Sequence, residues 1–392
     1  MLYDHIPCIK WDLNYMAGLH CFPLIWDGKS RRVAFIQKWN KVLLIKIIEI
    51  VQMLYLFLIC YVGLIQSLTR GQAGCNIFLL YSIQLGLSSV VLYLLGMGVQ
   101  HANSGGNLLN LLSAFENWLQ HTFQGRFRDK VRTRRNILLR RVLLFANGLC
   151  PTIAILRVRR LLKNICNPIF LGYAIGYCST CGKHVVIFGG GMILTGIKAG
   201  VIVFDGLHVA IMMSKAMFLL FDVILVATGC ILDCLDVIGR YSAGNNRIGL
   251  TVRIRLYRCL QLLEKQLNLF GSKRIVPAVL ISTPMVQICY TFVLIKFYRT
   301  QPIDGIVTYT IAISVCVVAC MVFETFAAQL AIKSEQRTQQ WFKEGGSKKC
   351  DRKILLSLQP MTIRIGSNFI DRGTALVTQN FCLTQTVSLL LM

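Results

Sequence analysis

The chain has 392 residues, of which 55% are hydrophobic and only 15% are charged, and its mean hydropathy is +0.59. This composition is too apolar for an ordinary soluble protein and predicts a polytopic membrane protein. The net charge of +25 would suggest nucleic acid in a soluble chain, but here the Lys and Arg residues lie between apolar runs, as in the cytoplasmic loops of membrane proteins. We therefore expect membrane lipid as a partner and no nucleic acid.

The cysteines and the polar motifs give no sign of a disulfide framework, a metal site or a catalytic centre. Many of the 16 cysteines lie within apolar runs, where a thiol usually fills space: Cys60, Cys230, Cys289, Cys316 and Cys320. Cys178 and Cys181 have metal-ligand spacing, but no second pair completes four ligands. No acid and base pair, nucleophile triad or cofactor loop appears, so we expect no enzyme, no metal and no cofactor.

The first 41 residues contain no secretory signal and are basic up to the first apolar run, which covers residues 42–64. The basic residues are Lys10, Lys29, Arg31, Arg32, Lys38 and Lys41. By the positive-inside rule, residues 1–41 form a cytoplasmic N-terminus and 42–64 the first span. Lys46 and Glu49 share a face of this span, and we expect them to pair with each other.

A second span is predicted at 76–97, and its helix is expected to continue into the cytosol. Apolar residues recur at helical spacing over 108–123, and a basic stretch follows at 126–135. This basic stretch again lies on the cytoplasmic side.

Three apolar windows follow, at 137–156, 168–204 and 209–232, where the charge pattern allows only two crossings, because the basic stretches on both sides are cytoplasmic. The first window contains Arg140 and Arg141. We therefore favour 167–188 as the third span and 200–221 as the fourth, with 137–156 as a cytoplasmic or interfacial helix.

The alternative assignment makes 137–156 the third span, and it stays open. In either case the fourth helix is expected to extend into the cytosol through Asp222, Asp233 and Asp236.

Residues 239–274 are polar and basic and contain an apolar stripe that predicts a helix packed on the other cytoplasmic extensions: Ile254, Leu256, Leu260, Leu263 and Leu267. The fifth span is predicted at 275–295 and the sixth at 305–330, with Glu324 near its inner end. Residues 331–368 form a basic cytoplasmic loop. Residues 42–330 thus contain the first six spans with their cytoplasmic loops and helical extensions.

The closing segment, 369–392, has no charge after Arg372 and is long enough for a seventh span. Polar residues recur in it among Leu and Val: Thr374, Thr378, Gln379, Asn380, Thr384, Gln385, Thr386 and Ser388. Such residues suit contacts between packed helices or the wall of a water-filled pore, and the composition leaves both open. Seven crossings give an all-α membrane protein with a cytoplasmic N-terminus and an extracellular C-terminus.

Two runs before the last span carry a family resemblance. Residues 353–360 read Lys-Ile-Leu-Leu-Ser-Leu-Gln-Pro, and residues 365–376 read Ile-Gly-Ser-Asn-Phe-Ile-Asp-Arg-Gly-Thr-Ala-Leu. This stretch resembles the insect gustatory receptors. That family ends with Thr-Tyr, five mostly apolar residues and Gln-Phe; here the frame falls on Thr384-Gln385, residues 386–390 and Leu391-Met392, so only the threonine matches.

The resemblance implies a gustatory receptor in the plasma membrane of taste neuron dendrites. It implies a tetramer, of one chain or with other gustatory receptor subunits, around a non-selective cation pore that small-molecule tastants open. Tastants would bind among the outer halves of the earlier helices, where Tyr55, Tyr61, Tyr81 and Tyr290 are contacts or simple packing. The alternatives are a membrane transporter and a G-protein-coupled-type receptor, and the charge layout disfavours the latter because its N-terminus would lie outside.

A cation pore needs polar groups that replace ion hydration and an apolar ring that closes by dewetting. In the seventh helix we expect the polar groups to be Thr384, Gln385, Thr386 and Ser388. We expect the apolar ring to be Leu389, Leu390 and Met392.

Overall fold

The computed structural model describes residues 2–70, 98–122, 134–163, 178–180, 183–186, 192–243, 249–273, 275–299, 303–345 and 349–391. The described chain is almost entirely helical, which confirms the predicted all-α class. Its helices are α1 (Ile6–Gly18), α2 (Trp39–Arg70), α4 (Gly98–Thr122), α5 (Arg134–Lys163), α7 (Met192–Met217), α8 (Val226–Ala243), α9 (Leu250–Gly271), α10 (Ile275–Lys296), α11 (Ile303–Gly345), α12 (Lys349–Leu356) and α13 (Thr374–Leu391).

Short elements connect these helices. A 3-10 turn, η1 (Leu2–Asp4), precedes α1, and a π-helix, η3 (Phe218–Leu225), joins α7 to α8. Three antiparallel hairpins pair β1 (Leu24–Asp27) with β2 (Arg32–Phe35), β3 (Cys178–Thr180) with β4 (Lys183–Val186), and β5 (Arg364–Ile365) with β6 (Asn368–Phe369).

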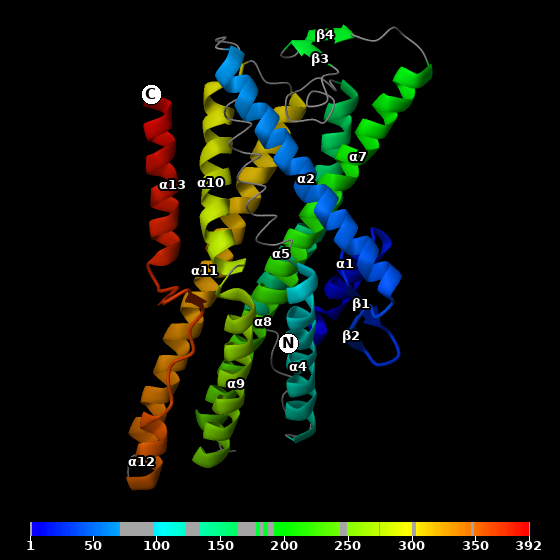
Figure 1. Ribbon diagram of the computed structural model, residues 1–392. Coiled ribbons are helices and arrows are strands. Elements are labelled where there is room, and N and C mark those ends of the chain that lie inside the picture. Colours follow the sequence, from blue (N-terminus) through cyan, green and yellow to red (C-terminus); the bar gives the residue numbers. More distant parts are fainter. Residues whose placement is uncertain are drawn as a thin grey trace.

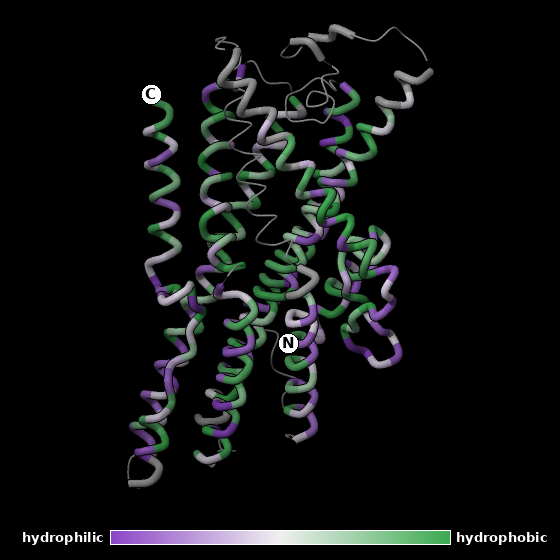
Figure 2. The backbone as a smooth tube through the Cα atoms, viewed as in Figure 1, coloured by the Kyte–Doolittle hydropathy of each residue, from purple (hydrophilic) through white to green (hydrophobic). Residues whose placement is uncertain are grey.

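Helices α4, α9, α10, α11 and α13 run roughly along the long axis of the molecule, whereas α2 and α7 are strongly tilted and cross each other in this view (Figure 1). Two halves can be distinguished along this axis. The upper half holds the end of α13 and most of α2 and α10, and the lower half holds α4, α9 and α12. The N-terminus lies in the lower half and the C-terminus at the upper end. Hydrophilic residues are frequent at the lower ends of α9, α11 and α12 and around the β1–β2 hairpin (Figure 2). The lower half is therefore the part of the molecule better suited to contact with water.

Four helical stretches in the described part of the chain are long and apolar enough to cross a membrane: Arg135–Lys163, Ala199–Gly239, Ile275–Lys296 and Gly305–Glu344. In addition, α2 leaves large apolar side chains exposed, among them Ile50, Leu54 and Phe57, as a helix in contact with lipid does. The expected span at 76–97 lies outside the described residues.

The favoured assignment of the third span is wrong. Residues 178–180 and 183–186 pair as the β3–β4 hairpin, so 167–188 cannot be a membrane helix, whereas α5 runs unbroken through 137–156. The structure supports the alternative assignment. Arg140 and Arg141, which argued against it, are exposed on α5. At the two ends of the helix, Arg135 donates hydrogen bonds to Asp233 of α8, and Arg160 lies 5.8 Å from the ring centroid of Tyr309 on α11.

Helix α5 packs closely on the continuous helix α7–η3–α8 because glycines face it. A Cβ atom at Gly206 would lie 2.8 Å from Cγ2 of Val158, and one at Gly229 would lie 2.9 Å from Cδ2 of Leu139. Small residues at such contacts let the helix backbones approach, which is the usual source of packing energy between helices in a membrane.

The predicted stripe of α9 is buried as expected. Ile254, Leu256, Leu260, Leu263 and Leu267 all belong to the core, and α9 packs on α4 and α8. The sixth helix, however, does not end near residue 330: α11 continues to Gly345, with Trp341 fully buried against Tyr257 of α9. The first part of the predicted loop 331–368 is therefore a helix that joins the lower bundle.

The expected pairing of Lys46 with Glu49 is also wrong. Glu49 accepts a hydrogen bond from the buried ammonium of Lys215 on α7, at 3.2 Å, whereas Lys46 is exposed. The tertiary partner is preferred because it neutralises a buried cation that no neighbour in sequence can reach.

The close contact at Gly206 predicts that an added methyl group lowers stability at this position but not at Gly196. Gly206→Ala should destabilise the chain by about 1–3 kcal/mol, because Val158 must shift. We expect a lower apparent melting temperature in detergent. Gly196→Ala is the matched control on the same helix, where a Cβ meets open space. Equal melting temperatures for the two variants would contradict the packing.

Burial of His5 predicts a stability that depends on pH. Its burial lowers its pKa from 6.5 to about 4. Between these two pH values the side chain is protonated in the unfolded chain and neutral in the folded chain. Stability should therefore fall as pH decreases from about 7 to about 4, by up to about 3 kcal/mol from this group. His5→Leu should reduce the fall in apparent melting temperature between pH 7.5 and 5, whereas His20→Asn, at an exposed position, should not.

Candidate pore helix and the contacts that hold it

The segment that leads into α13 is held between α9 and α11. Its apolar side chains are buried: Leu358, Met361, Ile363 and Ile370. Asn268 of α9 acts like a neighbouring strand, because its amide donates to the carbonyl of Thr362 at 2.7 Å and accepts from the N–H of Arg364 at 2.9 Å. The N–H of Met361 donates to the hydroxyl of Ser334 on α11 at 2.9 Å. The start of α13 is thereby fixed relative to the lower bundle.

A tight hairpin and a cap set the direction of α13. Gly366 has a φ of +57°, the left-handed conformation that a II′ turn requires at its first central position. Oδ1 of Asp371 then accepts hydrogen bonds from the N–H of Gly373 at 3.1 Å and from the N–H and hydroxyl of Thr374 at 2.9 and 2.6 Å. The Thr374 hydroxyl and these N–H groups lower the pKa of Asp371. The strand and the cap explain why the helix begins at Thr374 and not at the predicted 369.

One face of α13 packs on α10 and α11. Ala375, Cys382 and Thr386 are buried there. Gln287 of α10 donates to Gln379 at 3.0 Å, and Thr378 donates at 3.1 Å to Glu324 of α11, whose side chain is fully buried. This face uses its polar groups as contacts between helices.

The opposite face of α13 has no partner in the described part of the chain. Asn380, Thr384 and Ser388 follow one another at intervals of four residues and so form one stripe along the helix. Asn380 and Thr384 are exposed and Ser388 is half-buried. We call these three residues the polar stripe. Beside it runs an exposed apolar strip of Leu376, Leu383 and Val387, and on its other side Val377 and Phe381 are exposed as well.

The structure divides the predicted pore residues between these faces. Thr384 and Gln385 are exposed, and Ser388 is half-buried. Thr386 is buried toward α10, and its hydroxyl donates to the carbonyl of Cys382 at 2.7 Å. Leu389 and Leu390 pack on the aromatic cluster of the upper half described next, and Met392 lies outside the described residues.

A buried aromatic and polar cluster joins several helices in the upper half. Tyr55 of α2 donates a hydrogen bond to Asp205 of α7, and its ring lies 4.5 Å from that of His208 between centroids. Tyr55 also belongs to an apolar cluster with Phe292 of α10 and Tyr309 of α11. We call Tyr55, Asp205, His208, Phe292 and Tyr309 together the upper cluster. Leu389 and Leu390 of α13 pack against it, so it contacts the end of the candidate pore helix.

The other tyrosines singled out in the sequence lie in different surroundings. Tyr290 is half-buried, with its ring centroid 5.2 Å from that of Tyr309. Tyr61 is exposed and stacks on Phe57. Tyr81 lies outside the described residues.

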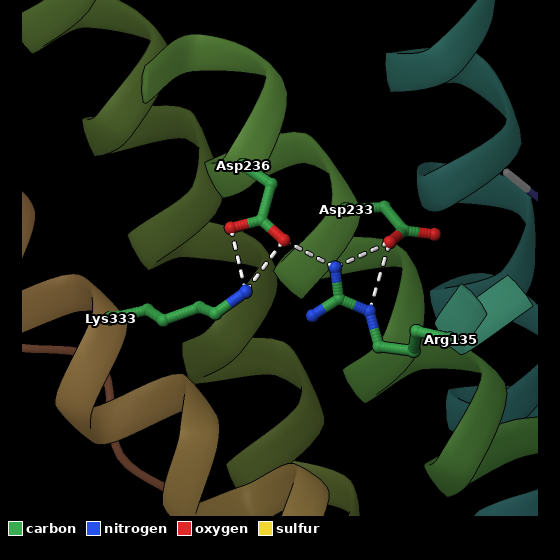
Figure 3. Close-up of polar contacts among 4 residues, drawn as sticks. All are labelled: Arg135, Asp233, Asp236 and Lys333. Atoms are coloured by element: carbon green, nitrogen blue, oxygen red, sulfur yellow. Dashed lines mark hydrogen bonds and ion pairs between the residues drawn. The ribbon is translucent and has the colours of Figure 1, made fainter. Parts of the chain in front are cut away.

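Four charged residues join three helices in the lower half (Figure 3). Arg135 of α5 donates to Oδ1 of Asp233 on α8 from Nε at 3.0 Å and from Nη2 at 2.7 Å, and it also donates to Asp236. Lys333 of α11 donates to both carboxylate oxygens of Asp236 at 2.7 and 2.8 Å. We call this group the ionic cluster. Asp236 thus neutralises two cations from two different helices.

Two features of the site were missed in the sequence. The polar stripe could have been found, because Asn380, Thr384 and Ser388 have the spacing of one helical face. The contacts of Glu324 and Gln287 with α13 could not, since their partners lie 54 and 92 residues away.

No known family profile and no curated protein matches the chain. Among solved structures, the fold is similar to that of the insect olfactory receptor OR5 from Machilis hrabei in complex with eugenol. The TM-score is 0.59 over 99% of both chains, with 12% sequence identity. The chain therefore shares the overall fold of this insect olfactory receptor.

The ionic cluster predicts that Asp236 matters more than other acidic residues of the lower half. Asp236→Asn should destabilise the chain by about 2 kcal/mol, because Lys333 and Arg135 lose a charged acceptor. Glu335→Gln, an exposed carboxylate on α11, should change stability by less than about 0.5 kcal/mol. The measurement is the apparent melting temperature in detergent, and similar losses for both variants would refute the assignment.

Proposed function

We propose that the chain is a gustatory receptor subunit of a ligand-gated, non-selective cation channel that detects tastants. The observation that carries the proposal is the division of α13 into a packed face and a free face with the polar stripe. The likeness to an insect olfactory receptor over the whole chain supports it.

The free face of α13 needs water or protein beside it. A row of amide and hydroxyl groups facing hydrocarbon is costly, because lipid offers no hydrogen-bond partners. Copies of α13 around a common axis would remove this cost by turning their polar stripes toward a water-filled centre. We propose a tetramer, of this chain alone or with other gustatory receptor subunits.

The gate is assigned to the end of α13. Leu389, Leu390 and Met392 would close the pore by dewetting, and Thr384, Gln385 and Ser388 would replace ion hydration. Thr386 faces α10, so it acts as packing in this proposal. Because Leu389 and Leu390 contact the upper cluster, a ligand that rearranges the cluster would move the gate.

The tastant site is assigned to the upper cluster. Tyr55, Asp205 and His208 combine aromatic surface with polar groups that can orient a small molecule. The solved olfactory receptor is a complex with eugenol, which supports a small-molecule ligand for this fold.

The proposed orientation follows the positive charges. The N-terminus and the basic lower half are cytoplasmic, the C-terminus is extracellular, and the channel lies in the plasma membrane of gustatory neuron dendrites. An N-terminal epitope reached by antibody in intact cells would contradict this orientation and favour a G-protein-coupled-type receptor.

The polar stripe predicts which face of α13 is accessible to water. Cells that express Thr384→Cys should lose most of their tastant-evoked current after an external methanethiosulfonate reagent, because the modified side chain would block the pore. Leu383→Cys, one residue away on the apolar strip, should be unaffected. The parent chain, treated with the same reagent, shows how much of the current is lost through modification of the cysteines that the chain already contains. Equal effects at both positions would contradict the assigned face.

The same cells separate the channel from its alternative. Tastant-evoked cation current without substrate uptake supports the channel. Uptake without current would replace it with a membrane transporter. The proposal contains no catalytic step.

A further inference from the structure

A basic cleft lies in the lower half, between the N-terminal elements and α4. It has a volume of about 660 Å³, within the range of small-ligand sites. Its polar lining comes from α1, the β1–β2 turn and α4: Lys10, Arg31, Arg32, Ser113, Asn117 and His121. No lining residue is acidic.

The cations of this cleft are not neutralised by the chain. Lys10, Arg31 and Arg32 are exposed and form no ion pair with any described residue. A nearby carboxylate is engaged elsewhere. Asp27 stands opposite Arg32 in the hairpin register, and its carboxylate accepts hydrogen bonds from the N–H groups of Lys29 and Ser30. Three permanent positive charges therefore face one solvent-filled space.

The walls of the cleft are fixed to each other. The side chain of Asn110 on α4 accepts from the N–H of Val33 at 2.9 Å and donates to its carbonyl at 2.8 Å, which ties the hairpin to the helix. Tyr3 donates a hydrogen bond to Asn117. Arg31 has a φ of +51°, a left-handed conformation that is rare for arginine and holds the turn in shape. The cleft is thus preorganised.

The cleft also lies close to the start of a membrane helix. Only residues 36–38 separate β2 from α2, whose first residue, Trp39, is 72% exposed. Lys38 and Lys41 flank this tryptophan. Exposed tryptophan beside lysines is typical of the interface between lipid headgroups and water.

We propose that this cleft binds a small anion with two or more phosphate groups. Arginine and lysine with hydroxyl and amide donors are the groups that recognise phosphate. The anion could be the headgroup of an anionic lipid in the adjacent leaflet or a free polyphosphate in the cytosol. The assignment to a lipid headgroup depends on the proposed orientation of the channel. The recognition of phosphate by the cleft depends only on its charge.

The test measures binding to the purified full-length chain. The probes are phosphatidylinositol bisphosphate in nanodiscs of neutral lipid and free inositol trisphosphate. The triple variant Lys10→Gln, Arg31→Gln, Arg32→Gln should lose affinity by at least about 10- to 100-fold, which is the loss expected for even one charged hydrogen bond. The matched control Arg255→Gln, Arg258→Gln, Lys265→Gln removes the same residue types from the exposed face of α9 and should keep parental affinity.

A second variant separates a shaped site from diffuse charge. Ser113→Trp fills the cleft without changing its charge and should also weaken binding. Parental melting temperatures establish that each variant is folded. Tighter binding of the lipid than of free inositol trisphosphate assigns a membrane source, and equal or tighter binding of inositol trisphosphate assigns a cytosolic one.

Equal losses in the triple variant and its control, or no binding of either probe to the parent chain, would overturn the proposal. Tastant-evoked current in the parent chain tests the channel separately, so a failure of one proposal does not imply a failure of the other.

Discussion

The position of Asp236 is the constraint on which the arrangement of the helices depends most. Its carboxylate accepts from Arg135 of α5 and Lys333 of α11 while it lies on α8 (Figure 3). A half-buried carboxylate that contacts two cations joins three helices at one level, and the buried Asp233 beside it holds the same Arg135. The same helix α11 carries Ser334, which holds the segment before α13, so the ionic cluster and the candidate pore helix share one support.

The candidate pore helix α13 packs against other helices of the described chain along one face only. Gln379 and Thr378 contact Gln287 and Glu324, whereas the polar stripe forms no hydrogen bond to another helix of the described chain. Its one hydrogen bond there is internal, from the Ser388 hydroxyl to the carbonyl of Thr384 at 2.9 Å. A helix with polar groups on both faces is expensive in lipid, and this cost disappears if further copies of the helix enclose water. The one-sided packing is therefore the physical reason to expect an assembly.

Two further groups of polar residues lie at opposite ends of the helices. The upper cluster buries Tyr55 and Asp205 against the helices that contact the end of α13. The basic cleft lies in the lower half, beside the first residues of α2. A ligand in the first would act on the end of α13, and an anion in the second would act on the N-terminal elements that pack on α4. These sites are chemically different, since one is aromatic and enclosed and the other is cationic and open.

The sequence by itself determined the all-α class of the protein, most of its helices and the packed helix that follows the fourth span. The windows at 42–64, 275–295 and 305–330 lie within α2, α10 and α11, and the stripe from Ile254 to Leu267 is buried as predicted. These features depend on hydrophobicity and helical spacing, which are local properties. The tertiary structure alone decided that residues 137–156 belong to one long apolar helix, that β3 and β4 pair, that Glu49 pairs with Lys215, and which face of α13 is free. The reason is that a hydropathy window assigns one cost to a charged residue, whereas the true cost depends on a partner that the chain supplies from far away. Arg135 and Asp233 lie 98 residues apart, and Glu49 and Lys215 lie 166 apart.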